Sequence, residues 1–252
     1  AVSAVIAAPA AAGSAARAAQ DATVATFDRA RVRNVEVRVI DNDQPGLIVT
    51  ETGGSTLVLE GALPQGIDDA FNLKLAAPLT GAQTVTVTLS IDAAQLQLTG
   101  VGAGNTLTFN AGNWNTGVTI GVLAVNDAAR EDFKHSLIGI AVTGNTGAAA
   151  YAGLSRQLAV DVYDNDTAGV LVIESDGATH VVNDDPATAL DESVTDTYSV
   201  RLTSAPTADV TIAVQTDGQA TTVPATLTFT AANWFTAQTM TVFRLGNAIV
   251  WR

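Results

Sequence analysis

The sequence predicts an all-β protein made of antiparallel β-sandwiches in tandem, and three observations lead to this prediction. Short segments that alternate apolar and polar residues recur along the 252-residue chain, and a period of two is typical of half-buried strands. RVIDNDQPGLIVTE at 38–51 returns as DVYDNDTAGVLVIE at 161–174, which is 123 residues later. No segment has the pattern of an amphipathic helix. Many short strands separated by turn residues are typical of sandwiches.

This repeat divides the chain into three parts. Residues 1–43 are predicted to be the C-terminal part of a preceding β-sandwich, residues 44–166 a complete repeat, and residues 167–252 an incomplete following repeat. Because the outer parts contain only pieces of the unit, we expect the natural protein to be longer. The apolar positions of the strand before each Asp-Asn-Asp motif correspond: Val35, Val37 and Val39 align with Leu158, Val160 and Val162.

In the complete repeat, eight segments have the length and composition of strands. The clearest is TVTVTLSID at 84–92, with apolar residues on one face and Thr or Ser on the other. The others are 47–51, 56–61, 71–78, 107–114, 118–125, 136–142 and 156–162. In the incomplete repeat, matching strands are expected within 198–206, 209–217 and 227–236. The last of these matches LTFNAGNWNT at 107–116 at seven of ten positions.

Composition excludes several functional classes. The net charge is −13, which disfavours binding to nucleic acid or to an anionic membrane surface. The surface charge suits a cation binder, although it equally serves solubility. The chain has no Cys and two His, so disulfides, thiol catalysis and His-rich zinc sites are not expected. No run of about 20 apolar residues predicts a membrane span. No pattern of catalytic residues stands out either, so we do not expect an enzyme.

The two Asp-Asn-Asp motifs are the candidate metal ligands. They place Asp41 with Asp43, and Asp164 with Asp166, after a predicted strand. Calcium takes six to eight oxygen ligands, so partners must come from elsewhere in the repeat. The candidates lie at strand ends and in an acidic loop: Glu60, Asp92, Asn126, Asp127, Glu131 and Asp132. The alternative interpretation is that Asp and Asn only end a strand through hydrogen bonds to the main chain.

Five features of this chain resemble the Calx-beta family and its relatives in large bacterial surface proteins: LEG ending at Gly61, the LTF and NW motifs of 107–114, AVND with ED in 124–132, YAG at 151–153, and DND at 164–166. The resemblance implies immunoglobulin-like sandwiches in a linear array, with Ca²⁺ at one end of each, near the joint to the next domain. The ligands implied by position are Glu60, Asp92, Asp127, Asp132, Asp164 and Asp166, and less directly Asn126 and Glu131. Asn126 departs from a common Asp pair.

The incomplete repeat departs further from the family pattern. It keeps Glu192 and Asp217, but Gly246 and Asn247 replace the acidic loop, so a calcium site is not expected there. Phe109 with Trp114 could be read as a sugar-stacking platform. Their recurrence as Phe229 with Trp234 favours a structural role instead.

We therefore expect a non-catalytic segment of an extracellular or cell-surface bacterial protein, with calcium-stiffened repeats acting as a stalk or spacer. The expected partners are neighbouring repeats of the same chain, other copies of it, or cell-surface ligands. Two alternatives remain open at this point. One is a glycan- or protein-binding module of an adhesin or secreted enzyme. The other is a self-assembling surface-layer or filament subunit.

Overall fold

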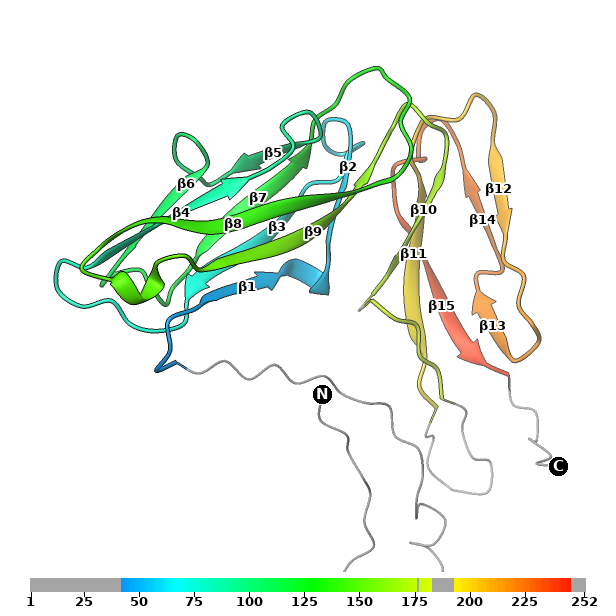
Figure 1. Ribbon diagram of the computed structural model, residues 1–252. Helices are drawn as coiled ribbons and strands as arrows, with labels where there is room; N and C mark the ends of the chain where they lie inside the picture. Colours follow the sequence, from blue (N-terminus) through cyan, green and yellow to red (C-terminus); the bar gives the residue numbers. More distant parts are fainter. Residues whose placement is uncertain (1–41, 176, 183–192, 246–252) are drawn as a thin grey trace, which may run out of the picture. The chain divides into compact units, whose positions relative to one another are not determined.

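A computed structural model describes residues 42–175, 177–182 and 193–245. These residues belong to one compact unit that begins at Asn42. The strand expected around Val37, the candidate ligand Asp41 and the acidic residue Glu192 lie outside the described residues. Within the described residues the elements are β-strands and two short 3₁₀ turns, Thr52–Gly54 and Ala149–Tyr151, so the fold is all-β as predicted (Figure 1). None of these helical turns is long and apolar enough to cross a membrane.

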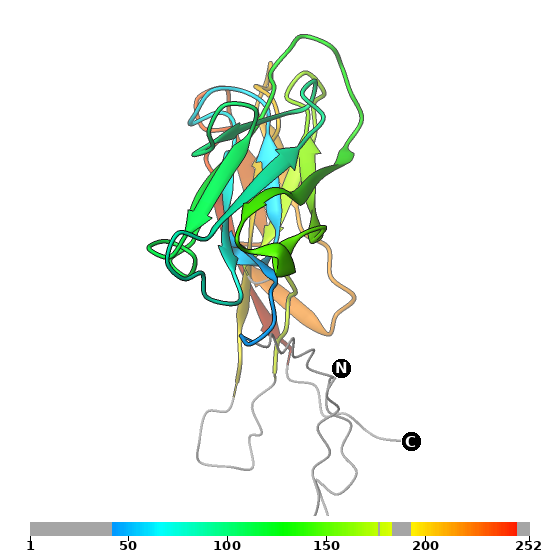
Figure 2. The same cartoon turned by 60° about the vertical axis from the view of Figure 1, so that its left-hand side comes forward.

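The strands between Leu47 and Tyr163, within the predicted repeat at 44–166, form two sheets around one buried cluster. The first sheet has the order β1-β3-β7-β5, formed by Leu47–Glu51, Asp69–Leu75, Val118–Ala124 and Leu96–Thr99. The second has the order β2-β9-β8-β4-β6, formed by Thr56–Leu59, Ser155–Tyr163, Lys134–Thr146, Thr84–Ser90 and Thr106–Asn110. The long strands β8 and β9 run side by side, in green in Figures 1 and 2.

The alternating pattern of the sequence produces the core between these sheets. On β4 the residues Val85, Val87 and Leu89 are buried while the threonines between them are only half-buried. Twenty-three buried hydrophobic residues form one cluster. Phe109 is fully buried and Trp114 packs against the cluster, which confirms their structural role.

Two features of this sandwich differ from what the pattern predicts. Strand β5 was not predicted, because its four residues Leu96–Thr99 offer only two apolar positions. In addition, one strand pair is parallel: β2 runs alongside β9, with Leu59 opposite Tyr163. Periodicity identifies a strand but not its partner, so the parallel pair could not be read from residue order.

The chain after the second Asp-Asn-Asp motif forms one complete sheet and a strand pair. The sheet has the order β10-β11-β15-β13, from Val170–Glu174, Asp196–Leu202, Gln238–Arg244 and Ala220–Val223. The pair joins β12 (Val210–Ala213) to β14 (Thr226–Phe229). Strand β13, another four-residue segment, was not predicted. The buried cluster here has five members: Val200, Leu202, Leu227, Phe229 and Met240.

Candidate metal centre

The parallel pairing of β2 with β9 brings the candidate site together. Both strands end at the same edge, and the amide of Glu60 donates a hydrogen bond of 3.0 Å to the carbonyl of Tyr163. The next residue after Tyr163 is Asp164. Two carboxylates that are 104 positions apart in the chain therefore leave neighbouring strands in the same direction.

Three carboxylates gather at this edge. Oxygen atoms of Glu60, Asp164 and Asp166 lie within 4.8 Å of one another. Glu60 is 2% exposed and Asp164 is 7% exposed, while Asp166 is open to solvent. Like charges at this spacing repel one another, and a divalent cation relieves that repulsion.

Hydrogen bonds hold Asp164 in its charged form. One carboxylate oxygen accepts from the Glu131 amide at 2.7 Å and the Thr167 hydroxyl at 2.6 Å, and the other accepts from the Asp166 amide at 2.6 Å. Burial alone would raise the pKa of Asp164, but these hydrogen bonds outweigh it and lower the pKa. Asp164 is thus an ionised carboxylate fixed in one orientation at the end of β9.

Glu60 is in the opposite situation. Burial raises its pKa to about 7, assisted by the charges of Asp164, Asp127 and Glu131, although a hydrogen bond from the Asp127 main chain acts against this rise. Its Oε2 atom is buried without a hydrogen-bond partner. A buried polar atom without a partner costs about 1–3 kcal/mol. A bound cation would supply the missing partner, because an all-oxygen donor set suits calcium or another hard cation.

The local sequence around Glu60 explains its position. Gly61 adopts a φ of 108°, a backbone conformation that favours glycine. A Cβ at this position would lie 3.0 Å from the side-chain nitrogen of Asn165. That nitrogen donates to the side-chain oxygen of Asn126 at 2.8 Å. The Glu-Gly pair therefore turns the chain sharply and lets the Asp-Asn-Asp motif pack against it.

The acidic loop contributes through its main chain more than through its carboxylates. Glu131 forms an ion pair with Lys134 at 2.7 Å and accepts a hydrogen bond from Gln95 at 3.0 Å. The side-chain hydrogen bond from Lys134 is the largest influence that lowers the pKa of Glu131. Glu131 thus has cationic and amide partners of its own, while its amide orients Asp164.

The remaining candidates stand outside the three-carboxylate cluster. Asp92 and Asp127 each accept a hydrogen bond from the amide two residues later, Ala94 at 3.0 Å and Ala129 at 2.6 Å. Asp132 and Asp43 are exposed and do not join the cluster. Sequence reasoning missed Thr167, Gln95 and Lys134 as supporting residues. Only Thr167 carried a signal, because it directly follows the Asp-Asn-Asp motif.

Comparisons with known proteins add little to this description. No family model matches the chain, and no curated protein matches it. A solved structure described as "Crystal structure of CBD12 from CALX1.2" is similar over 78% of this chain and 76% of its own, with 13% sequence identity and a TM-score of 0.30. The strands define an all-β sandwich fold, and three carboxylates gather at one edge of it.

Proposed function

We propose that this chain is a non-catalytic structural segment of an extracellular or cell-surface protein, in which a bound calcium ion stiffens the joint between successive sandwich repeats. Glu60, Asp164 and Asp166 would hold the ion, and the chain would serve as a stalk or spacer. The observation that carries the proposal is the buried Oε2 of Glu60, which has no hydrogen-bond partner and lies beside two further carboxylates.

The position of the cluster supports a role at the joint. Asp164 and Asp166 stand in the short connection between β9, the last strand of one repeat, and β10, the first strand of the next. Glu60 belongs to the body of the first repeat, at the end of β2. An ion shared by these residues would tie the connection to the sandwich, so that the connection would lose rotational freedom.

The aromatic residues give no support to the glycan-binding alternative. Phe109 and Phe229 are fully buried, and Trp114 and Trp234 pack against their respective clusters. The two phenylalanines lie inside the cores and the two tryptophans are partly buried against them, which favours a structural role for all four rings.

Calorimetric titration of the full chain with CaCl₂ after chelator treatment tests the calcium site. We expect saturable binding, weakened at least about tenfold by Asp166→Asn, since removal of a ligand or its support typically costs a factor of 10–100. Asp166 is exposed, so this variant should fold. The matched control is Asp209→Asn, an exposed carboxylate in the following repeat, which should bind calcium like the parent. Absence of binding at millimolar calcium, or equal binding by Asp166→Asn, contradicts the site.

Small-angle scattering of the same protein tests the stiffening. We expect the maximum dimension to become better defined and the flexibility to fall when calcium is added. Asp209→Asn should repeat that response and Asp166→Asn should not. Calcium binding without a change in scattering would leave the site in place but overturn the stalk mechanism.

A further inference from the structure

One buried arginine lies outside the acidic cluster. Arg201 stands on β11 of the following repeat and is 6% exposed. Arginine is almost never buried to this extent unless its guanidinium is paired. Burial lowers the pKa of Arg201, because removing a cation from water disfavours its charged form. The burial of Arg201 therefore calls for a compensating contact.

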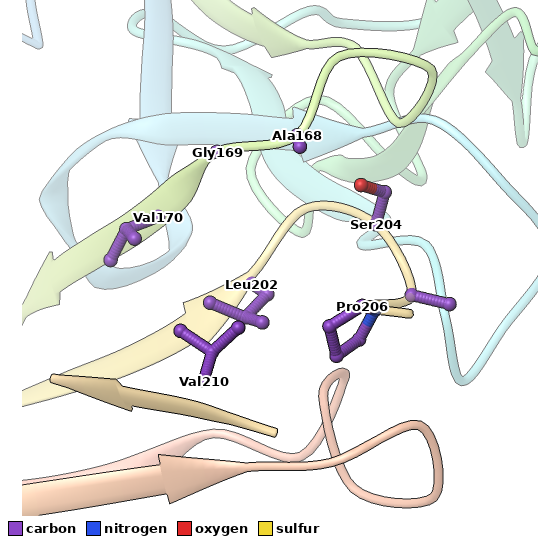
Figure 3. A pocket seen from close by; sticks show the side chains of 8 residues that line it. Ala168, Gly169, Val170, Leu202, Ser204, Pro206 and Val210 are labelled. Carbon is purple, nitrogen blue, oxygen red and sulfur yellow. The ribbon is translucent and has the colours of Figure 1, made fainter. Parts of the chain in front are cut away.

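Arg201 points away from the core of its own repeat. Side chains alternate between the two faces of a strand, and the neighbours Val200 and Leu202 both belong to the buried cluster of that repeat. Val170, which is opposite Leu202 on β10, lies on that same side (Figure 3). Arg201 therefore lies on the outer face of the sheet, together with Leu171, which is opposite it on β10.

The outer face is nevertheless buried at this place. Leu171 is 1% exposed although it belongs to neither hydrophobic cluster. In the complete repeat, Ile48 and Lys74 form the pair with the same register, and both are only half-buried. The sheet alone therefore does not account for the burial of Leu171 and Arg201, and another part of the chain covers them.

A loop of the preceding sandwich reaches this face. The Nη2 atom of Arg201 donates a hydrogen bond to the main-chain carbonyl of Gln65, in the connection between β2 and β3. The two residues are 136 positions apart in the chain. A hydrogen bond from a charged donor is stronger than one between neutral groups. The buried cation thus finds its partner in the other repeat.

The loop that carries this carbonyl is tightly closed. The amides of Gln65 and Gly66 both donate to the carbonyl of Ala62 at 3.0 Å. Gly66 has no room for a side chain, because a Cβ there would lie 2.0 Å from the carbonyl oxygen of Gly61. The loop therefore presents the Gln65 carbonyl to Arg201 in one orientation.

A second contact lies at the next position on the same face. Thr203 is 4% exposed, and its hydroxyl donates to the carbonyl of Thr167 at 2.8 Å. Thr167 stands in the connection between β9 and β10, where its own hydroxyl donates to the Asp164 carboxylate at 2.6 Å. In the complete repeat, the residue that follows the corresponding leucine is Ala76, which has no hydroxyl. This contact is thus specific to the following repeat.

We propose that the outer face of β10 and β11 is a docking surface for the loop 61–66 of the preceding sandwich, and that Arg201 and Thr203 fix the angle between the two repeats without a metal ion. Thr203 is bound at the connection itself, whereas Arg201 is bound beside it. The two contacts together oppose rotation about the connection, which neither would prevent alone. An ion at Asp164 would then stabilise a geometry that the docking already selects, so this proposal does not rest on the ion.

The distance between two spin labels, measured in chelator by double electron–electron resonance, tests the docking. Because the chain has no cysteine, Thr108→Cys and Thr228→Cys place one label at an exposed position of each repeat, on β6 and on β14. We expect a single narrow distance distribution. Arg201→Met keeps the length of the side chain but removes the guanidinium, and it should broaden the distribution. The ratio of docked to undocked molecules should fall at least about tenfold, which corresponds to about 1.4 kcal/mol.

Two further variants complete this test. Arg156→Met removes an exposed arginine of β9 and is the matched control, which should keep the narrow distribution. Thr203→Val removes the second contact from a residue of similar size and should also broaden the distribution. Circular dichroism should show the same sheet content in all variants, so that a broader distribution reports orientation and not unfolding. A broad distribution in the parent, or a narrow one in both Arg201→Met and Thr203→Val, overturns the proposal.

Calcium separates this proposal from the one for the acidic cluster. Arg201→Met should bind calcium like the parent, because it changes no carboxylate of the cluster. A parent distribution that is broad in chelator and narrows with calcium would overturn the docking but keep stiffening by the ion. A narrow distribution in chelator without any calcium binding would keep the docking and overturn the metal site.

Discussion

The complete repeat and the repeat that follows it share the register of one sheet but differ in the other. Leu47 pairs with Leu75 in the first, and Val170 pairs with Leu202 in the second. Yet Leu47 is 3% exposed and Val170 is 52% exposed. Similar sequences thus form similar strand pairs, whereas burial depends on whether the second sheet has its central strands. Strand pairing is local to each sheet, but a closed core requires both layers.

The largest expected effect on stability comes from removing the corresponding phenylalanines, Phe109 and Phe229. Phe109→Ala should cost about 3–5 kcal/mol of unfolding free energy, the usual range for removing a buried Phe. Phe229→Ala should cost clearly less, because Phe229 belongs to a cluster of five buried residues whereas Phe109 belongs to a cluster of twenty-three. Denaturant unfolding of the parent and of each variant, followed by tryptophan fluorescence, measures both costs. Equal costs would show that the second core is as tightly formed as the first.

The pH dependence of the metal-free protein provides the second test. The pKa of Glu60 is about 7 in the folded protein against an ordinary value of 4.5 for a glutamate, so between these values the folded chain keeps a proton that the unfolded chain releases. Stability should therefore fall as the pH rises from about 4.5 to 7, by up to about 3 kcal/mol, and then level off. Denaturation in chelator across this range measures it.

Two controls isolate Glu60 in that experiment. Glu60→Gln should remove this component of the pH dependence, while Glu174→Gln, an exposed residue of the following repeat, should retain it. Calcium should also suppress the loss of stability near pH 7, since it favours the ionised carboxylate. A stability that rises through this window in the parent but not in Glu60→Gln would contradict the assignment of the raised pKa.

The smallest expected effect on stability comes from Tyr151, whose hydroxyl contacts the main chain of Ala77. Tyr151→Phe leaves the amide and carbonyl of Ala77 without the hydroxyl that they contact, at a cost of about 1–3 kcal/mol. Tyr198→Phe in the following repeat is the matched control. Burial raises the pKa of Tyr198, and no hydrogen bond is among the causes of that shift. Thermal unfolding of both variants measures the difference. Equal, small losses would mean that the hydroxyl is not needed to seat Tyr151.

The sequence predicted those parts of the fold that depend on local pattern. Strands such as 84–92 alternate over enough residues to be recognised, and the motif at 164–166 repeats. Strands β5 and β13 have four residues each, too few for the alternation to stand out. The candidate site was also predicted only in part, because only some of its residues belong to a recognisable local motif. Glu60 and Asp164 carried recognisable motifs, whereas Asp92 and Asp132 were grouped with them from their expected places at strand ends or in loops and from the family resemblance, and a sandwich has strand ends at several edges.

The parallel pairing of β2 with β9 has a mechanical consequence. When residues 44–166 are pulled from their two ends, the force first acts on the start of β1 and on the end of β9. Once β1 has separated from β3, the force acts on the start of β2 and on the end of β9 in opposite directions. The four registered pairs from Thr56 with Val160 to Leu59 with Tyr163 are then loaded in shear and must yield together rather than one after another. The cluster at Asp164 lies where the pulling force enters β9, so an ion held there would reinforce the point of attachment.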